Sequence, residues 1–364
     1  MSAQIQPPSS LGQRHELLDR KLLNGVLWAA VVVTSFVVLR EGKDLFVPLV
    51  IALVAVYLIT VLSRMAQRIK INGHSLPSAV TMILSFAFIF GLGYALFRLV
   101  AENALLVAEA APGYQARLIQ LQQDLFGALG IEEPVGTRKI IGSIDLQSAF
   151  TTVASTLASV LGRASLVFLY SLFILIELRF LEAKLNALIP NDTRRTNVVH
   201  VLKRIDEDIH KYLGVKTAIS LLTAILSYAV MRAVGLDFAE FWAVLVFILN
   251  FIPTLGSIVS TMLPTILAAV QFTSLGPFLV VGIGITAIQQ LLGSIIEPNL
   301  MGETLNISPL VVFASLILWG YIWGIVGMFL CVPITVIIVI VMSNFDSTRW
   351  VSILLSKTGQ VRSD

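Results

Sequence analysis

The chain alternates between long apolar runs and shorter polar stretches. An apolar run of about 20 residues spans the hydrocarbon core of a bilayer as an α-helix, whereas a run of 10 to 14 is more typical of a buried helix in a soluble domain. The candidate spans lie at 22–39, 45–62, 79–98, 156–178, 214–234, 239–271, 276–296 and 309–342. The pattern predicts an all-α polytopic integral membrane protein with about eight transmembrane helices, grouped as three in 22–98, one in 156–178 and four in 214–342.

Composition agrees with this reading. Of the 364 residues, 57% are hydrophobic and only 13% are charged, against roughly 25% charged residues in ordinary soluble domains. The net charge of +3 does not indicate nucleic-acid binding, because membrane proteins gather Lys and Arg on cytoplasmic loops for topological reasons. We therefore expect the lipid bilayer, and no nucleic acid, as a partner.

The basic residues also predict an orientation. Most of the 25 Lys and Arg residues lie on the side of the membrane that holds both termini, in or beside the segments 1–21, 64–70, 179–213 and 343–364. The positive-inside rule places that side in the cytoplasm. No short apolar stretch with a cleavage site precedes the first span, so we expect no cleaved signal peptide. The prediction is a multi-pass protein of the bacterial inner membrane with cytoplasmic N-terminal (1–21) and C-terminal (343–364) tails.

Two segments outside the spans have helical patterns. In the external insertion 99–155, leucines recur at helical spacing over 113–130, after a break at Pro112 and Gly113. In the cytoplasmic region 179–213, Asn191 and Asp192 precede an amphipathic helix and are suitable N-caps. This second helix is predicted to lie on the membrane or on a loop; the alternative is an oligomerisation or regulatory element.

The segments 239–271 and 309–342 are too long for simple spans and contain Pro and Gly. We expect broken, strongly tilted or re-entrant helices here. In the first of them, Pro253 removes a backbone donor and Gly256 permits unusual torsions, within the stretch that also holds Asn250 and Thr254. Transporters present freed backbone groups to solutes at such points. The alternative is a kink that a neighbouring helix or Thr254 satisfies.

Glu297 is the principal charged candidate. It follows an apolar run whose last turns contain Gln289 and Gln290, and it precedes Pro298 and Asn299. A carboxylate near a membrane span is costly unless it is paired, hydrated or neutralised, so it is a functional candidate. The alternative is an interfacial residue that reaches water at the end of a helix.

Small residues and prolines mark the late segments as places of close helix packing. Gly320 and Gly324 have the four-residue spacing that lets helices approach closely, and Gly327 follows. Pro309 and Pro333 bracket this region. We interpret these five residues, together with Pro298 and Gly302, as structural.

Catalytic and cofactor signatures are missing from the sequence. There is no phosphate-binding loop, no paired-histidine metal motif and no serine-nucleophile elbow, and Cys331 is the single cysteine. We expect no enzyme activity, no metal, no cofactor and no ATP hydrolysis by this chain.

From about Asn250 onward the sequence resembles the autoinducer-2 exporter (AI-2E) family of bacterial membrane transporters. The matching stretches are Phe251-Ile252-Pro253 with Gly256, then Glu297-Pro298-Asn299-Leu300-Met301-Gly302, Ser308-Pro309-Leu310, Gly324-Ile325-Val326-Gly327 and Val332-Pro333. The resemblance implies export of the quorum-sensing signal autoinducer-2 or, as in other branches of the family, Na+(Li+)/H+ antiport. Thr254 and Ser257 depart from the family pattern, which has an aromatic residue and a proline there.

These observations lead to one hypothesis and two alternatives. The first is a transporter of a small polar solute whose pathway is lined by Asn250, Pro253, Thr254, Gly256, Gln289, Gln290, Glu297 and Asn299. The alternative within transport is a Na+(Li+)/H+ antiporter in which Glu297 exchanges a proton for a cation. The alternative from another class is a membrane scaffold that holds a partner through its cytoplasmic helix. A homo-oligomer is expected because the glycine-lined spans and amphipathic helices offer surplus packing surface.

Overall fold

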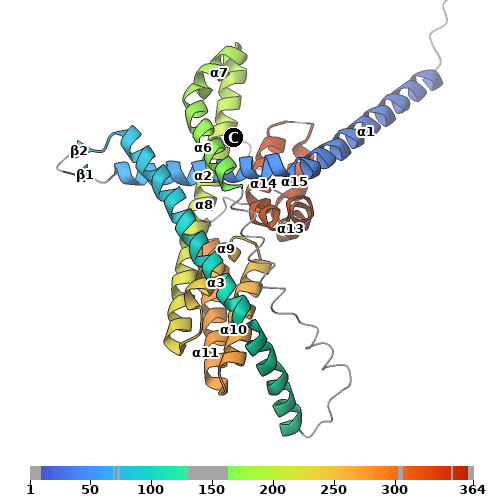
Figure 1. Cartoon of the computed structure of the whole chain (residues 1–364). Helices are drawn as coiled ribbons and strands as arrows, with labels where there is room; N and C mark the ends of the chain where they lie inside the picture. Colours follow the sequence, from blue (N-terminus) through green and yellow to red (C-terminus); the bar gives the residue numbers. More distant parts are fainter. Residues whose placement is uncertain are drawn as a thin grey trace, which may run out of the picture. The chain divides into compact units, whose positions relative to one another are not determined.

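The computed structural model describes residues 10–68, 70–71, 74–129, 163–301, 306–345 and 347–359. Helices make up most of this part of the chain (Figure 1). A two-residue strand β1 (Lys70–Ile71) pairs antiparallel with β2 (His74–Ser75). The chain divides into two compact units, Met1–Val47 and Pro48–Asp364.

The first unit consists mainly of α1 (Ser10–Glu41), which contains the predicted span 22–39. Gly42 separates this helix from α2 (Lys43–Gln67), and its amide donates to the carbonyl of Val38 at 2.8 Å. A side chain at Gly42 would collide with that carbonyl and with the ring of Phe46. The sequence therefore needs a glycine at this junction.

In the described part of the chain, six helical segments are long and apolar enough to cross a membrane: Lys43–Gln67, Ser78–Asn103, Ala164–Leu188, Asp192–Val234, Leu275–Met301 and Ile325–Ser343. They confirm the polytopic helical class. The expected number was eight. The difference arises because α1 is not among the six, and because the predicted span 239–271 divides into two shorter apolar helices.

The third helix, α3 (Ser78–Leu129), continues through Pro112. The predicted break at Pro112 and Gly113 was wrong. Val107 and Tyr114, on either side of the proline, pack on one hydrophobic cluster, and this packing supports a helix that lacks a single backbone donor. The Tyr114 hydroxyl donates to Asp237 at 3.0 Å, and burial together with this bond raises the pKa of Tyr114 to about 12.

Residues 130–162 lie outside the described part of the chain, and with them most of the predicted insertion 99–155 and the start of the span 156–178. The described part of that span forms α6 (Ala164–Glu177), a 3-10 turn η1 (Leu178–Phe180) and α7 (Leu181–Leu188).

One uninterrupted helix, α8 (Asp192–Val234), covers both the predicted cytoplasmic helix and the predicted span 214–234. The sequence predicted that a cytoplasmic helix ends at residue 213 and a span begins at residue 214, but α8 runs through this position without a break. The first half of this helix is charged and the second half is apolar, but both halves consist of residues that a helix tolerates. The change from polar to apolar surroundings therefore does not interrupt the backbone hydrogen bonds of the helix. Asn191 caps its start by accepting from the Arg194 amide at 3.1 Å, as predicted, and Gly235 ends it in the left-handed conformation.

The two long late segments are broken, as predicted. The first divides into α9 (Ala239–Leu249) and α10 (Leu255–Gln271), and the second into α13 (Pro309–Trp323) and α14 (Ile325–Ser343). Between them lies a continuous helical stretch of three parts. These are α11 (Leu275–Gln289), the π-helix η2 (Gln290–Ile296) and α12 (Glu297–Met301).

The C-terminal region folds back on the loop that precedes α13. After α15 (Arg349–Leu355), Ile307 forms a β-bridge with Ser356, and the Ser308 amide donates to the carbonyl of Leu355 at 3.0 Å. The segment predicted as a tail, 343–364, therefore has a described, docked part.

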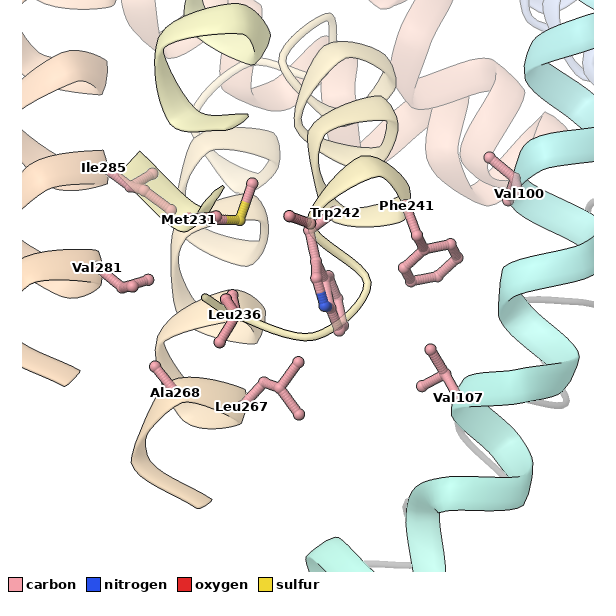
Figure 2. Packing of buried hydrophobic residues seen from close by; sticks show 11 residues of the cluster. Val100, Val107, Met231, Leu236, Phe241, Trp242, Leu267, Ala268, Val281 and Ile285 are labelled. Carbon is pink, nitrogen blue, oxygen red and sulfur yellow. The ribbon is translucent and has the colours of Figure 1, made fainter. Parts of the chain in front are cut away.

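The main hydrophobic core forms where α3, α8, α9, α10 and α11 meet (Figure 2). Phe241 and Trp242 of α9 lie between Val107 of α3 on one side and Met231 and Ile285 on the other. This cluster bounds the polar residues described next.

Candidate functional site

An ion pair joins α8 to α12. The Lys216 ammonium donates to both carboxylate oxygens of Glu297, at 2.8 Å to Oε1 and 3.0 Å to Oε2. Only 9% of the Lys216 side chain and 15% of the Glu297 side chain are exposed. Both residues lie in segments apolar enough to cross a membrane. Charges in such segments are costly, and they are usually paired and functional.

The pair lies where the charged first half of α8 passes into its apolar second half. Glu297 is likewise near the end of the helical stretch Leu275–Met301. A glutamate at a helix end ordinarily extends toward water. Here the carboxylate is instead directed to a buried lysine, which argues against the purely interfacial interpretation.

Two further buried polar contacts are made by residues of the same helical stretches that hold the ion pair. One helical turn after Lys216, Ser220 accepts a hydrogen bond from the side-chain amide of Asn250 at 3.1 Å. Gln289, on the same helical stretch as Glu297, donates to Ser260 of α10 at 3.0 Å. These four side chains are buried. We call the six residues Lys216, Glu297, Ser220, Asn250, Ser260 and Gln289 the polar ladder.

The π-helix η2 sets the direction of Glu297. A π-helix has wider turns than an α-helix and is uncommon except at functional sites. The stretch from Gln290 to Ile296 lies directly before Glu297 and after Gln289. In an α-helix each residue advances about 100° around the axis, so removing this irregularity would turn Glu297 away from Lys216.

The break between α9 and α10 places Asn250 at the ladder. Asn250 is the C-cap that directly follows α9, and the chain then reverses its direction through Pro253 and Thr254 before α10 begins. Gly256 lies so close to the carbonyl of Leu249 that a Cβ atom there would overlap the oxygen. The Leu249 carbonyl, which lies within the reach of the break at Pro253, accepts from the Ile252 amide at 2.8 Å. The break is thus closed by local contacts.

Thr254 adopts φ 60° and ψ −58°. A β-branched residue rarely takes a positive φ, and such conformations cluster at functional sites. Its side chain is exposed.

The second break has the same construction. Gly324 has φ 65° and ψ −141°, a conformation that requires glycine, and a Cβ at Gly327 would overlap the carbonyl of Trp319. Gly320 packs on Met328 across the turn. Gly320, Gly324 and Gly327 thus lie in or beside this turn, whereas Gly302 lies outside the described residues.

The structure brings together only some of the predicted pathway residues. Asn250, Gln289 and Glu297 belong to the polar ladder, and Pro253 and Gly256 form the turn that positions Asn250. Gln290 is exposed and accepts from Ser294, and Thr254 and Asn299 are also exposed. Within the described chain, the side chains of these three form no hydrogen bond with the ladder.

Sequence reasoning missed Lys216, Ser220 and Ser260. Lys216 was counted only as a basic residue on the cytoplasmic side. A signal was present, because Lys216, Ser220, Thr223 and Ser227 recur at helical spacing through an apolar stretch, and all four are buried. The Ser227 hydroxyl has no hydrogen-bond partner among the described residues.

The ladder ends at the hydrophobic core. Met231 follows Ser227 by one turn on α8, and Ile285 precedes Gln289 by one turn on α11. Both are fully buried in the cluster that Figure 2 shows. Among the described residues, no group of three His, Cys, Asp or Glu side chains could hold a metal ion.

Comparison with known proteins gives a consistent result. A family model described as "AI-2E family transporter" matches residues 26–346. The chain is 30% identical to a "Putative transport protein" of Borreliella burgdorferi, over 92% of this chain and 91% of the relative. It is 29% identical to "AI-2 transport protein TqsA" of Escherichia coli, over 92% and 96% of the two chains. The matches cover both breaks and the whole polar ladder.

Proposed function

This chain belongs to the AI-2E transporter family, and we propose that it moves a small neutral polar solute, autoinducer-2 being the first candidate, across the bacterial inner membrane without hydrolysing ATP itself. One observation carries the proposal. Buried polar side chains of α8 and of the stretch Leu275–Met301, two segments apolar enough to span a bilayer, pair with each other and with polar side chains at α9 and α10, and polar residues inside membrane spans are costly and usually functional.

The ladder offers hydrogen bonds to a neutral solute. The side-chain nitrogens of Asn250 and Gln289 donate to serine hydroxyls, which holds both carboxamides in place. Among the described residues, the side-chain oxygens of Asn250 and Gln289 accept no hydrogen bond, so both oxygens can accept one from a solute. A carboxamide oxygen accepts from a hydroxyl group, so a hydroxylated solute suits these positions.

The hydrophobic core supports a barrier across this route. Polar side chains occupy α8 from Lys216 to Ser227, and apolar ones follow at Met231. A polar solute would lose its hydrogen bonds to the ladder on entering the apolar cluster around Met231 and Ile285, and this loss is costly. We propose that helix movement at this cluster gates the passage of solute.

The alternative of Na+(Li+)/H+ antiport requires a carboxylate that exchanges a proton for a cation. Glu297 is the candidate, and Lys216 already occupies both of its oxygens. We therefore place antiport second. The scaffold alternative depends on the charged half of α8 as a docking element; it predicts that purified protein in vesicles carries no solute.

The orientation and assembly that we propose are those expected from the sequence. Both termini face the cytoplasm, because the basic residues gather there. A homo-oligomer is supported by the exposed apolar surface of the spans, although lipid accounts for part of that surface.

The experiment is efflux of autoinducer-2 from vesicles that contain the purified protein alone. We expect efflux down the solute gradient without ATP and without a sodium or proton gradient. Efflux no faster than from empty vesicles would contradict the proposal. Sodium-driven pH change without solute efflux would favour antiport.

A further inference from the structure

The charge balance of the Lys216–Glu297 pair carries a further inference, which rests on the proposed function. One ammonium group engages both oxygens of the carboxylate, and both side chains are largely shielded from water. The pair has no net charge. A carboxylate in this environment without Lys216 would have to take up a proton or a metal cation, because an unpaired buried charge is very costly.

We propose that Lys216 is a tethered counter-cation: its ammonium occupies, on Glu297, the place that a coupling cation or proton would otherwise take. Transport is then independent of dissolved cations, because the Lys216 ammonium supplies the positive charge that Glu297 needs. Removing Lys216 should convert Glu297 into a site for a small monovalent cation or a proton.

The surroundings of Glu297 leave Lys216 as the compensating charge. Of the elements that the structure describes, those packed most closely against α12 are α8 and η2. The η2 residues, Gln290 to Ile296, include no titratable group. From α8, Tyr212 interacts electrostatically with Glu297, and it also interacts with Cys331 of α14. Tyrosine and cysteine side chains carry no positive charge, so neither Tyr212 nor Cys331 can replace Lys216.

A purely structural ion pair would behave differently. A staple between α8 and α12 loses stability when either partner is removed, whatever cation is in the buffer. A tethered counter-cation can be replaced by a dissolved one. The two roles therefore differ in the dependence of Lys216→Met on cations and pH, and in its rescue by a second substitution that removes the carboxylate charge.

The test is thermal unfolding of the full-length purified protein in detergent. Tm is measured in choline chloride and in sodium or potassium chloride at equal ionic strength, at several pH values from about 5.5 to 8. We expect a wild-type Tm that is the same in all three salts. The Tm of Lys216→Met should be lower in choline at pH 8 and should rise by several degrees with sodium, potassium or acid.

The double variant Lys216→Met/Glu297→Gln should regain cation independence, because both charges are gone. Lys184→Met is the matched control, since Lys184 pairs with Glu177 on an exposed surface and should give no cation dependence. If Lys216→Met fails to fold while the double variant folds, charge compensation by Lys216 is also supported.

Three outcomes would overturn the proposal: a wild-type Tm that depends on the cation, a Lys216→Met Tm equally low in every salt and at every pH, or a double variant no better than the single one. None of these measurements uses solute flux. Absence of autoinducer-2 efflux from wild-type vesicles would contradict the proposed function alone, so the two failures are distinguishable.

Discussion

Glu297 and Gly256 show how single residues set the geometry of the ladder. Glu297 is held by one lysine from another helix, and Gly256 provides the space in which the chain can reverse beside Leu249. Each role leads to a substitution with a matched control elsewhere in the chain.

Glu297→Gln keeps the shape of the side chain and removes its charge. Breaking a buried pair leaves an uncompensated lysine, at a cost of about 3–5 kcal/mol in fully buried cases and less at this partial exposure. We expect solute flux to fall at equal membrane abundance. The control is Glu177→Gln, which breaks an exposed pair worth about 0–1 kcal/mol. Wild-type flux in Glu297→Gln would return the residue to the role of an interfacial cap.

Gly256→Ala should destabilise the α9–α10 turn. The added methyl group would overlap the Leu249 carbonyl, so the backbone must shift. Overpacking of this kind costs about 1–3 kcal/mol, which thermal unfolding would detect as a lower Tm. Gly276→Ala in α11, where a methyl group meets nothing, is expected to be neutral or slightly stabilising. Equal Tm values for the two variants would refute the packing argument.

Sequence reasoning at this scale identified residues that the structure places in buried polar contacts where a residue was chemically unusual for its surroundings. Asn250, Gln289 and Glu297 are polar residues in or beside apolar runs, so pattern alone identified them. Lys216 was missed because it begins a predicted span, where a lysine is ordinary. Its partner lies 81 positions away, and tertiary pairing over that separation leaves no local signal.

At the scale of elements, prolines and glycines predicted the breaks in 239–271 and 309–342 but also suggested one at Pro112 that does not occur. The difference lies in packing. Gly256 and Gly327 allow one helix to lie against a carbonyl near the end of the preceding helix, whereas Val107 and Tyr114 hold α3 to one cluster across its proline. The π-helix η2 has no marker in the sequence that we could have used.

Inserting an alanine after Gly293 tests the role of η2. The extra residue advances the chain by about 100° around the helix axis, which would rotate Glu297 and separate it from Lys216. We expect loss of solute flux in vesicles with the protein still inserted. Gly293→Ala keeps the length of η2 and meets no neighbouring atom, so it should retain flux. Flux in the insertion variant would show that transport does not depend on the direction that η2 gives to the Glu297 carboxylate.

At the scale of the whole molecule, the apolar segments predicted a membrane protein, and six described segments have the length and composition of spans. The number of spans was less predictable because apolar composition does not distinguish one long helix from two packed halves. The continuity of α8 was hidden for a similar reason, since hydropathy reports the change of environment and not the end of a helix.

The orientation can be measured by labelling. Cys331 is the one cysteine in the sequence and is buried, so background labelling with a membrane-impermeant maleimide should be low. A cysteine in place of Thr196, exposed on α8, should react only from the cytoplasmic side, and one in place of Glu109, exposed on α3, only from outside. The reverse pattern would invert the proposed topology.

The central claim is that the solute crosses along the polar ladder, and counterflow of labelled autoinducer-2 in vesicles tests it most directly. The variant Asn250→Leu/Gln289→Leu keeps similar side-chain volumes and removes both carboxamides, while Gln290→Leu alters the exposed neighbour of Gln289. Loss of one hydrogen bond is worth about 1 kcal/mol, so losing two should lower counterflow about tenfold or more at equal protein abundance. The account predicts that loss in the double variant, with wild-type counterflow in Gln290→Leu. Wild-type counterflow in the double variant would contradict it.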